Sequence, residues 1–491
     1  MWVFAASTLL ALLAWGIYLF PQRIHHDNAM YLDCARLLLE GALPYVDFID
    51  PNPPLVMYLS VPPVWVAQKI GAPPASVFLW CVFGAVCWSV LALYRLGRPS
   101  RNTGVLAFAW AAFHFVVWDR GDFGQREHLF ATFAIPFLFL RWNRSSGLLP
   151  KRSSAIATGF LAGVGTSLKP HFLLPVLGAE AALLAAPRAR RPLALAAPEV
   201  LSFAFALGLY GAHFLVLPDP VRTAFFERWL PFLLDKYSSY DAPWMALLHR
   251  ATAGAMAVFV AWLGLVLYLK ISARPSARLA AALALFTLGG LAAYAVQRKG
   301  WHYQEVPALA GAVLCLPALL LWMRDRWVQN RPLSTSPPLA AAPLVVAAIA
   351  TCLFVRLVDP NVSDRVLALF SADRDATPSP TGFERLIELH SRTGEPVLVL
   401  STSVRPAYPA LFLRNRRPGS RYLWLFPLPG LARSRQDGAS LTKDERLFLT
   451  ELTEDVQKRR PALVVLPTGP CQSLGGGRLR IGPGRANRTS P

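Results

Sequence analysis

The chain has 491 residues, of which 54% are hydrophobic and only 16% charged, and its mean hydropathy is +0.38. A soluble enzyme carries about a quarter charged residues, so this composition excludes an ordinary soluble protein. The net charge of +20 does not indicate a nucleic-acid partner, because the basic residues gather in short loops between apolar stretches, as the positive-inside rule expects of cytoplasmic loops that contact membrane lipids.

The apolar stretches predict a polytopic α-helical membrane protein with about eleven transmembrane helices, because a bilayer core needs roughly 20 apolar residues for each crossing. The first stretch lacks a basic start and a small-residue cleavage site, so we interpret it as a retained helix and not a signal peptide. The predicted spans are Met1–Phe20, Val77–Tyr94, Gly104–Trp118, Leu129–Leu140, Ala155–Leu168, Phe172–Leu184, Leu193–Leu217, Ala251–Leu269, Leu279–Ala295, Val306–Met323 and Leu339–Val358.

The loops between these spans alternate in charge. Five basic clusters are assigned to the cytoplasmic side: Arg95, Arg98 and Arg101; Arg141, Arg144, Lys151 and Arg152; Arg188, Arg190 and Arg191; Lys270, Arg274 and Arg278; Arg324, Arg326 and Arg331. The outer side then receives residues 21–74, 119–128, 219–244 and 297–305, together with everything after Val358. Arginine and lysine in these outer loops break the charge rule, and a phosphate ligand would explain them.

The carboxy-terminal part differs in composition. Residues 359–470 are predicted to form a small soluble α/β outer domain, with strands at "EPVLVLST" and "PALVVLP" and a helix at "GFERLIELHSR". Residues 471–491 are rich in glycine, proline and arginine, which is typical of a disordered tail. Residues 1–358 form the predicted membrane domain, and residues 21–74 are its first outer loop.

The opening loop predicts two surface helices. From Met30 onward, apolar side chains recur on one helical face, whereas Asp33, Arg36 and Glu40 share another, so we expect a helix that lies along the membrane with Asp33 in water. Gly41 would end this helix in the left-handed conformation. A second apolar helix is expected to begin with Pro53 and Pro54 in its first turn.

Acidic residues crowd around these helices, and each has a structural alternative. Asp27 or Asn28 could cap the first helix, because side-chain oxygens accept its orphan N–H groups. Asp47 and Asp50 could form turns beside Pro51. The functional alternative is that Asp27 presents a carboxylate to a substrate at the membrane face.

One set of residues in this loop forms a recognisable pattern: Asp27, Tyr31, Ala35, Gly41, Pro44, Tyr45, Asp47, Pro53 and Pro54. It resembles the first outer loop of membrane glycosyltransferases of the GT-C fold, and among them the bacterial relatives of the protein-mannosyltransferase and aminoarabinose-transferase group. The similarity extends more loosely to "GTSLKPHFLLP" (165–175) and "HYQEVPAL" (302–309).

The resemblance implies an enzyme that moves a sugar from a polyprenyl-phosphate donor to a lipid, glycan or protein acceptor on the outer face, with inversion. This chain has Asn28 where the family usually has a second acid, so the resemblance leaves open whether a divalent metal (Mg/Mn) assists. The alanine-, arginine- and proline-rich composition is typical of a bacterium with GC-rich DNA. It predicts a multi-pass protein of the inner membrane whose site and C-terminal domain face the periplasm.

Such a transfer needs a base for the acceptor's proton and cations for the leaving phosphate. Asp27 is the candidate base, with a pKa raised by partial burial at the membrane surface. Glu127 is the second candidate acid and Asp122 a weaker one. The alternative for Glu127 is an ion pair with Arg126 that ties a loop to a helix end.

The donor phosphate is assigned to Lys169, Arg298, Lys299 and His302. Ionisable residues at membrane depth are functional candidates by default. The alternatives are that Lys169 reaches the headgroups and that the 298–299 pair anchors the interface together with Trp301 and Tyr303.

Further residues are expected near the substrate: His26, Tyr31, Tyr45, Asp47, Asp122 and Arg126. A metal site formed by His25 and His26 is disfavoured, because adjacent side chains rarely face one ligand. The aromatic-rich segment 219–244 is predicted to close over the donor as a lid. A transporter or flippase of lipid-linked sugars, and a non-catalytic cell-envelope assembly protein, are the alternative functions.

Overall fold

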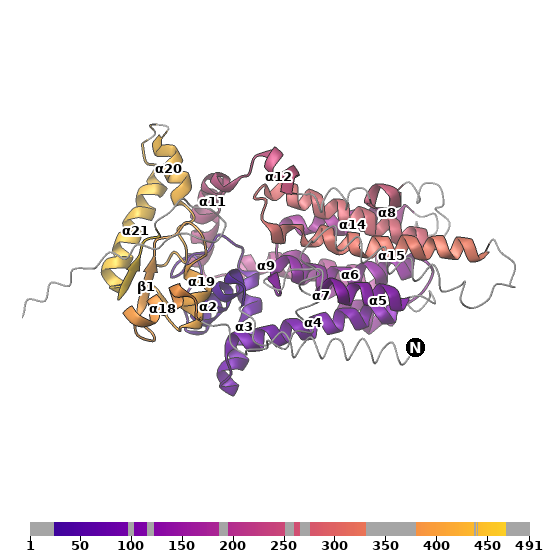
Figure 1. Ribbon diagram of the computed structural model, residues 1–491, viewed down its shortest axis with the longest axis horizontal. Helices are drawn as coiled ribbons and strands as arrows, with labels where there is room; N and C mark the ends of the chain where they lie inside the picture. Colours follow the sequence, from indigo (N-terminus) through magenta and orange to yellow (C-terminus); the bar gives the residue numbers. More distant parts are fainter. Residues whose placement is uncertain are drawn as a thin grey trace, which may run out of the picture. The chain divides into compact units, whose positions relative to one another are not determined.

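The computed structural model describes residues 24–96, 103–114, 122–185, 195–250, 260–265, 275–329, 380–436, 438 and 440–467. The protein is mostly helical and contains one small parallel sheet (Figure 1). Its contacts divide it into two compact units. The first consists of Met1–Arg23, Ser76–Val216 and Asp241–Thr377; the second consists of Ile24–Ala75, Leu217–Tyr240 and Pro378–Pro491.

The first unit is a bundle of apolar helices that run alongside one another (Figure 1). Its elements are α4 (Pro74–Leu96), α5 (Thr103–Ala112), α6 (Arg126–Ser145), α7 (Arg152–Ser167), η3 (Pro170–Phe172), α8 (Leu173–Leu184), α9 (Pro198–Val216), α12 (Trp244–Arg250), α14 (Pro275–Gln297), η7 (His302–Glu305) and α15 (Val306–Gln329). Within it, α14 packs against α8 and α15, and α7 packs against α9.

Glycine allows the closest of these helix contacts. A Cβ atom at Gly289 of α14 would lie 2.4 Å from the Cα atom of Pro175 in α8. A Cβ atom at Gly163 of α7 would lie 2.6 Å from the carbonyl oxygen of Phe203 in α9. Small residues at helix contacts are typical of bundles that pack in lipid, because they let the backbones approach closely.

Three of the described helices are long and apolar enough to cross a membrane: α4, α9 and residues Ser276–Gln297 of α14. Pro170–Leu184 is a shorter apolar stretch. The predicted spans Met1–Phe20 and Leu339–Val358 lie outside the described residues, and the total of about eleven crossings stays a prediction.

The basic cluster that begins at Arg141 differs from its prediction. Arg141 and Arg144 belong to α6 and not to a loop, and Arg141 is buried. The Arg141 guanidinium lies 2.7 Å from a carboxylate oxygen of Glu180 in α8 and 3.1 Å from one of Glu199 in α9, and Arg144 donates to Glu199 at 2.8 Å. Buried charges must be paired in an apolar bundle. Because the partners of these arginines belong to α8 and α9, the ion pairs join three helices.

The second unit combines three separate stretches of the chain. Its elements are α2 (His26–Leu39), α3 (Leu55–Ile70), α10 (Asp219–Thr223), η5 (Ala224–Trp229), α11 (Leu230–Lys236), η6 (Tyr237–Tyr240), α18 (Gly382–His390), β1 (Pro396–Val399), α19 (Ala407–Leu413), β2 (Arg417–Pro418), α20 (Leu428–Gln436), α21 (Lys443–Arg459) and β3 (Leu463–Val465). The strands pair in parallel in the order β2-β1-β3, with Val397 opposite Leu463. The two predicted strands and the predicted helix of this region are therefore confirmed as β1, β3 and α18.

The opening loop packs with this α/β region. The N–H of Ile49 donates to the carbonyl of Arg421 at 2.7 Å, and the N–H of Leu423 donates back to Ile49 at 3.3 Å. The indole N–H of Trp229, in the 219–244 segment, donates to the carbonyl of Tyr45 at 3.0 Å. The predicted boundary at residue 358 itself lies outside the described residues.

Helix α2 is not the exposed surface helix that its polar stripe predicts. Asp33 is 0% exposed: its carboxylate pairs with Arg36 at 2.6 Å and accepts a hydrogen bond from the Tyr408 hydroxyl at 2.7 Å. Burial raises the pKa of Asp33, and Arg36 and Tyr408 partly offset this rise. The prediction of a solvated Asp33 is wrong because α19 covers this face of α2.

Removing the Tyr408 hydroxyl should destabilise the second unit. Without this hydroxyl, the buried Asp33 carboxylate lacks a hydrogen-bond donor that offsets its loss of water. We therefore expect Tyr408→Phe to lower the free energy of unfolding by about 1–3 kcal/mol. Chemical denaturation of the purified protein measures this change. Glu40→Gln is the matched control, because Glu40 is an exposed acid at the C-cap of the same helix. Equal losses in the two variants would contradict the assignment.

Candidate functional site

The polar residues of the first unit gather around a break between two helices. Helix α7 ends at Ser167, and Lys169 has an extended backbone (φ −151°, ψ 135°) before Pro170 opens η3. Proline disfavours a helical conformation in the residue before it, so the sequence itself imposes the break at Lys169. The break carries the Lys169 side chain into a buried position at the start of the α8 segment.

The Lys169 ammonium contacts two segments that were predicted to lie on the outer side. It lies 2.5 Å from a carboxylate oxygen of Glu127, in the first turn of α6, and donates to the side-chain oxygen of Gln297 at 3.1 Å. Gln304 donates to the same oxygen at 2.9 Å, and the ring of Tyr303 lies 5.6 Å from the ammonium. Lys169 is therefore held by a carboxylate, an amide and an aromatic face.

The ion pair of Glu127 differs from the one weighed for it in the sequence. Arg126 is the first residue of α6 and is buried, but the carboxylate of Glu127 pairs with Lys169. Glu127 also stands where the partial positive charge of a helix N-terminus favours an acid. Gln297 and Gln304 were missed because an amide carries no charge signal in a sequence, although both flank the basic stretch that begins at Arg298.

Arg298 and Lys299 share a carboxylate that the sequence analysis did not single out. The Lys299 ammonium lies 2.6 Å from Asp241, and the Arg298 guanidinium lies 3.4 Å from it and 5.2 Å from the ring centre of Trp244. Arg298 has a positive φ of 54°, and its carbonyl accepts from Ala242 at 2.7 Å. Burial lowers the pKa of Lys299, and Asp241 opposes this shift.

Two further ionisable groups follow in η7. The exposed His302 lies 3.6 Å from the carboxylate of Asp122, a contact that joins two of the predicted site residues. Glu305 is buried, and burial raises its pKa to about 7, with a small opposing effect from His302. Sequence reasoning missed Glu305; its signal was an acid directly before an apolar span.

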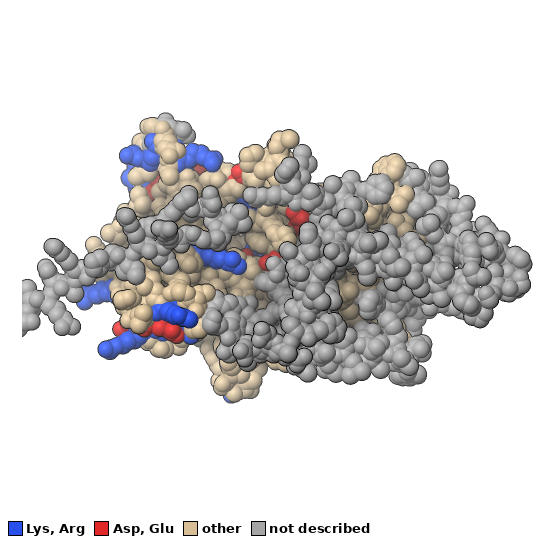
Figure 2. All heavy atoms as spheres, in the orientation of Figure 1, with Lys and Arg blue, Asp and Glu red and all other residues tan. Residues whose placement is uncertain are grey.

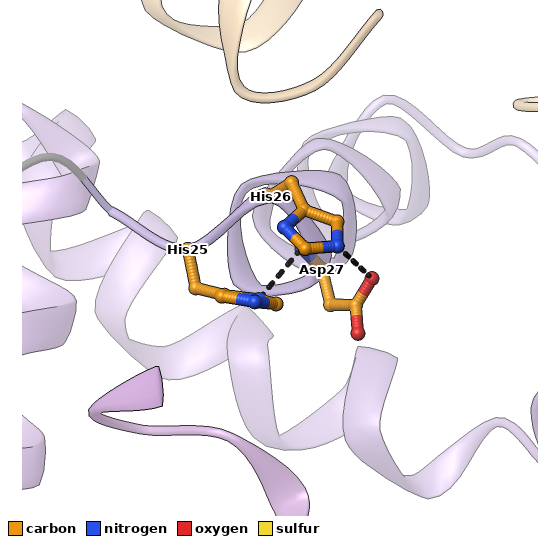
Figure 3. Close-up of side chains that lie close together, drawn as sticks. All are labelled: His25, His26 and Asp27. Atoms are coloured by element: carbon orange, nitrogen blue, oxygen red, sulfur yellow. Dashed lines mark hydrogen bonds and ion pairs between the residues drawn. The ribbon is translucent and has the colours of Figure 1, made fainter. Parts of the chain in front are cut away.

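The second unit contains the candidate base. Figure 3 shows His25, His26 and Asp27 at the start of α2, where their side chains lie close together. His25 caps the helix, because its Nδ1 accepts from the N–H of Asp27 at 3.2 Å. The predicted capping by Asp27 or Asn28 is therefore corrected. The buried Asp27 carboxylate lies 3.5 Å from Nε2 of His26.

The hydrogen bonds of this group do not fit a metal ion. His25 accepts at Nδ1 from a backbone N–H, and His26 accepts at Nδ1 from the Arg405 guanidinium at 3.1 Å. A neutral imidazole that accepts at one nitrogen carries its proton on the other, so Nε2 of each ring lacks the lone pair that a metal needs. Burial lowers the pKa of His26, Asp27 opposes this shift and Arg405 adds to it. The charge of Arg405 also disfavours a cation here.

Three other predicted residues hold the opening loop together. Tyr31 is buried within α2. The Tyr45 hydroxyl donates to the carbonyl of Asn52 at 2.6 Å, and the Asp47 carboxylate accepts from the N–H of Leu43 at 2.7 Å. Asp47 thus has the turn-forming role that was its structural alternative, as has Asp50, which accepts from the N–H of Asn52 at 2.9 Å.

The predicted lid segment is tied, up to Tyr240, to the α/β region of the second unit. Arg228 lies 2.5 Å from Glu451, and Lys236 lies 2.6 Å from Glu445, so two residues of α21 hold the segment. Closure over a donor stays a prediction. So does the convergence of Asp27 with Lys169 and His302, because Asp27 belongs to the other unit.

No family model and no curated protein matches this chain. The assignment of chemistry therefore rests on two sets of residues: the contacts of Lys169, and the group of His25, His26 and Asp27.

The pKa of Glu305 predicts a specific pH dependence of stability. Between its ordinary value and about 7 the folded protein binds a proton that the unfolded chain has released, so the free energy of unfolding falls as the pH rises through this range. The free energy of unfolding of the wild type should fall by about 2–3 kcal/mol between roughly pH 5 and pH 8, and Glu305→Gln should not show this fall. Denaturation at both pH values measures it. A pH-independent difference between variant and wild type would refute the shift.

Proposed function

We propose that this chain is a membrane glycosyltransferase of the GT-C type. It would transfer a sugar from a polyprenyl-phosphate donor, with inversion, to a lipid, glycan or protein acceptor on the outer face of a cell membrane. The observation that carries the proposal is the buried Lys169, held beside Glu127 at a proline break between apolar helices. Ionisable residues at membrane depth are functional candidates by default.

Lys169 and the Arg298–Lys299 pair, which directly follows its partner Gln297 in sequence, form the proposed phosphate-binding cluster. Lys169, Arg298 and Lys299 supply positive charge from segments separated by more than a hundred residues in sequence, and each lies beside a carboxylate. A phosphate that enters this cluster would compete with those carboxylates for the cations. Such exchange supports binding of an anionic headgroup better than binding of a neutral sugar.

Asp27 is the proposed base. Its carboxylate stands in the first turn of α2, 3.5 Å from Nε2 of His26. The acceptor's hydroxyl or amine would attack the anomeric carbon and lose its proton to Asp27, while the polyprenyl phosphate leaves. Glu127 is the second acid of the proposal, and its contact with Lys169 favours a role in balancing the phosphate-binding cation.

A transporter or flippase for a lipid-linked sugar is the second candidate. The same paired charges in an apolar bundle favour it, because transport pathways also carry intramembrane ions. It needs no base, and this difference separates the two functions.

Asp27→Asn should therefore abolish transfer and preserve donor binding. Loss of a general base lowers the rate about 10²–10⁴-fold, whereas an isosteric amide keeps the shape of the site. The measurement is transfer of radiolabelled sugar from polyprenyl phosphate by the protein in vesicles, together with donor affinity. Glu40→Gln, at the exposed C-cap of the same helix, should act as wild type. Unchanged transfer in Asp27→Asn would exclude Asp27 as the base.

Substitutions at Lys169 and Glu127 should change affinity for the phosphate in opposite directions. Glu127→Gln removes the competing carboxylate, so we expect tighter binding of a short-chain polyprenyl phosphate. Glu127→Gln/Lys169→Met removes both charges and leaves no unpaired buried ion, and we expect its affinity to fall about tenfold below wild type. Calorimetric titration in detergent measures both. Wild-type affinity in the double variant would exclude Lys169 from phosphate binding.

A further inference from the structure

Helix α3 buries one side and exposes the other. Its buried residues are Val56, Met57, Ser60, Pro63, Val64 and Ala67. On the opposite side Leu59 is 36% exposed, Trp65 50% and Ile70 66%. At 100° for each residue these side chains share one face with Pro62 and Val66, so the exposed stripe is apolar along most of the helix.

The charge of α3 fits a lipid surface. Lys69 is the single charged residue in Leu55–Ile70, and its ammonium lies 5.9 Å from the ring centre of Trp65. Figure 2 shows the visible side of α3 as almost entirely uncharged. Tryptophan and lysine near one helix end are typical of a membrane interface, where the ammonium reaches the lipid phosphates.

The covalent chain places α3 next to a candidate membrane span. Gly71, in the left-handed conformation (φ 68°), ends α3, and only Ala72 and Pro73 separate it from the start of α4. Three residues reach at most about 11 Å when fully extended. If α4 crosses a bilayer, the end of α3 must therefore lie at its surface. This continuity selects lipid as the occupant over a second copy or a protein partner.

The two prolines of α3 favour the interface over the hydrocarbon core. Pro62 and Pro63 lack the N–H groups that would bond to the carbonyls of Tyr58 and Leu59 four residues earlier. Water and headgroups can solvate such carbonyls, but lipid chains cannot. A helix of 16 residues is also only about 24 Å long, which is shorter than the hydrocarbon thickness.

We propose that α3 is an interfacial helix that lies in the outer layer of the bilayer, with Leu59, Trp65 and Ile70 among the acyl chains and Lys69 at the headgroups. The sequence predicted a surface position for both helices of the opening loop; the buried Asp33 argues against it for α2, and α3 keeps it. This inference depends on membrane insertion of α4 and is independent of the proposed sugar transfer.

The test is photo-crosslinking of the full chain in nanodiscs of phosphatidylethanolamine and phosphatidylglycerol. Benzoylphenylalanine replaces Trp65 in one variant, Ile70 in a second and Leu389 in a control, because Leu389 is an exposed apolar residue of α18 in the α/β region. We expect about tenfold more acyl-chain adduct at position 65 or 70 than at 389, because an interfacial helix buries its apolar face among lipid chains.

The Ile70 variant keeps the test valid if the Trp65 variant does not fold, as judged by its thermal unfolding midpoint. Lipid adducts at the level of the Leu389 control would overturn the proposal. A crosslink between two copies of the chain would overturn it in favour of a dimer contact.

Discussion

The contact between Lys169 and Glu127 is the constraint on which the first unit depends. An ammonium in apolar surroundings loses several kcal/mol of hydration, and removal of its partner carboxylate would leave an uncompensated buried charge. Because Glu127 belongs to the first turn of α6, Lys169 to the break before η3 and Gln297 to the end of α14, this contact fixes three segments together. The close approach of α14 to α8 at Gly289 holds the same helices from another side.

The same rule of paired charge repeats elsewhere in the bundle. Arg141 lies between Glu180 and Glu199, and Lys299 lies against Asp241. The two sets differ in what surrounds them. Arg141 joins helices that are otherwise apolar, which is a structural use of charge. Lys299 lies in a loop between α14 and η7, where Asp241 also pairs with Arg298.

Apolar periodicity in the sequence was sufficient to predict most helices, and β-branched runs predicted β1 and β3, because those signals are local. The break at Lys169 was also legible, since proline acts on its neighbour. Contacts between residues far apart in the chain could not be predicted in this way. Asp33 and Glu40 are placed on one polar face by the sequence, yet Tyr408, which is 375 residues from Asp33, buries only Asp33. The role of His25 as a cap was hidden because imidazole is an uncommon capping group.

The pairing of every cation in the cluster has a consequence for the proposed donor. In the proposed reaction, a phosphate would replace a carboxylate that already balances the charge of the cation. The exchange would leave the number of buried charges almost unchanged, so its cost would be mainly the release of Glu127 or Asp241 toward water. After the sugar had left, the phosphate would carry more negative charge than before, and the returning carboxylate would help to expel the product. Carboxylates beside the phosphate-binding cations would thus favour turnover over tight retention of the spent lipid.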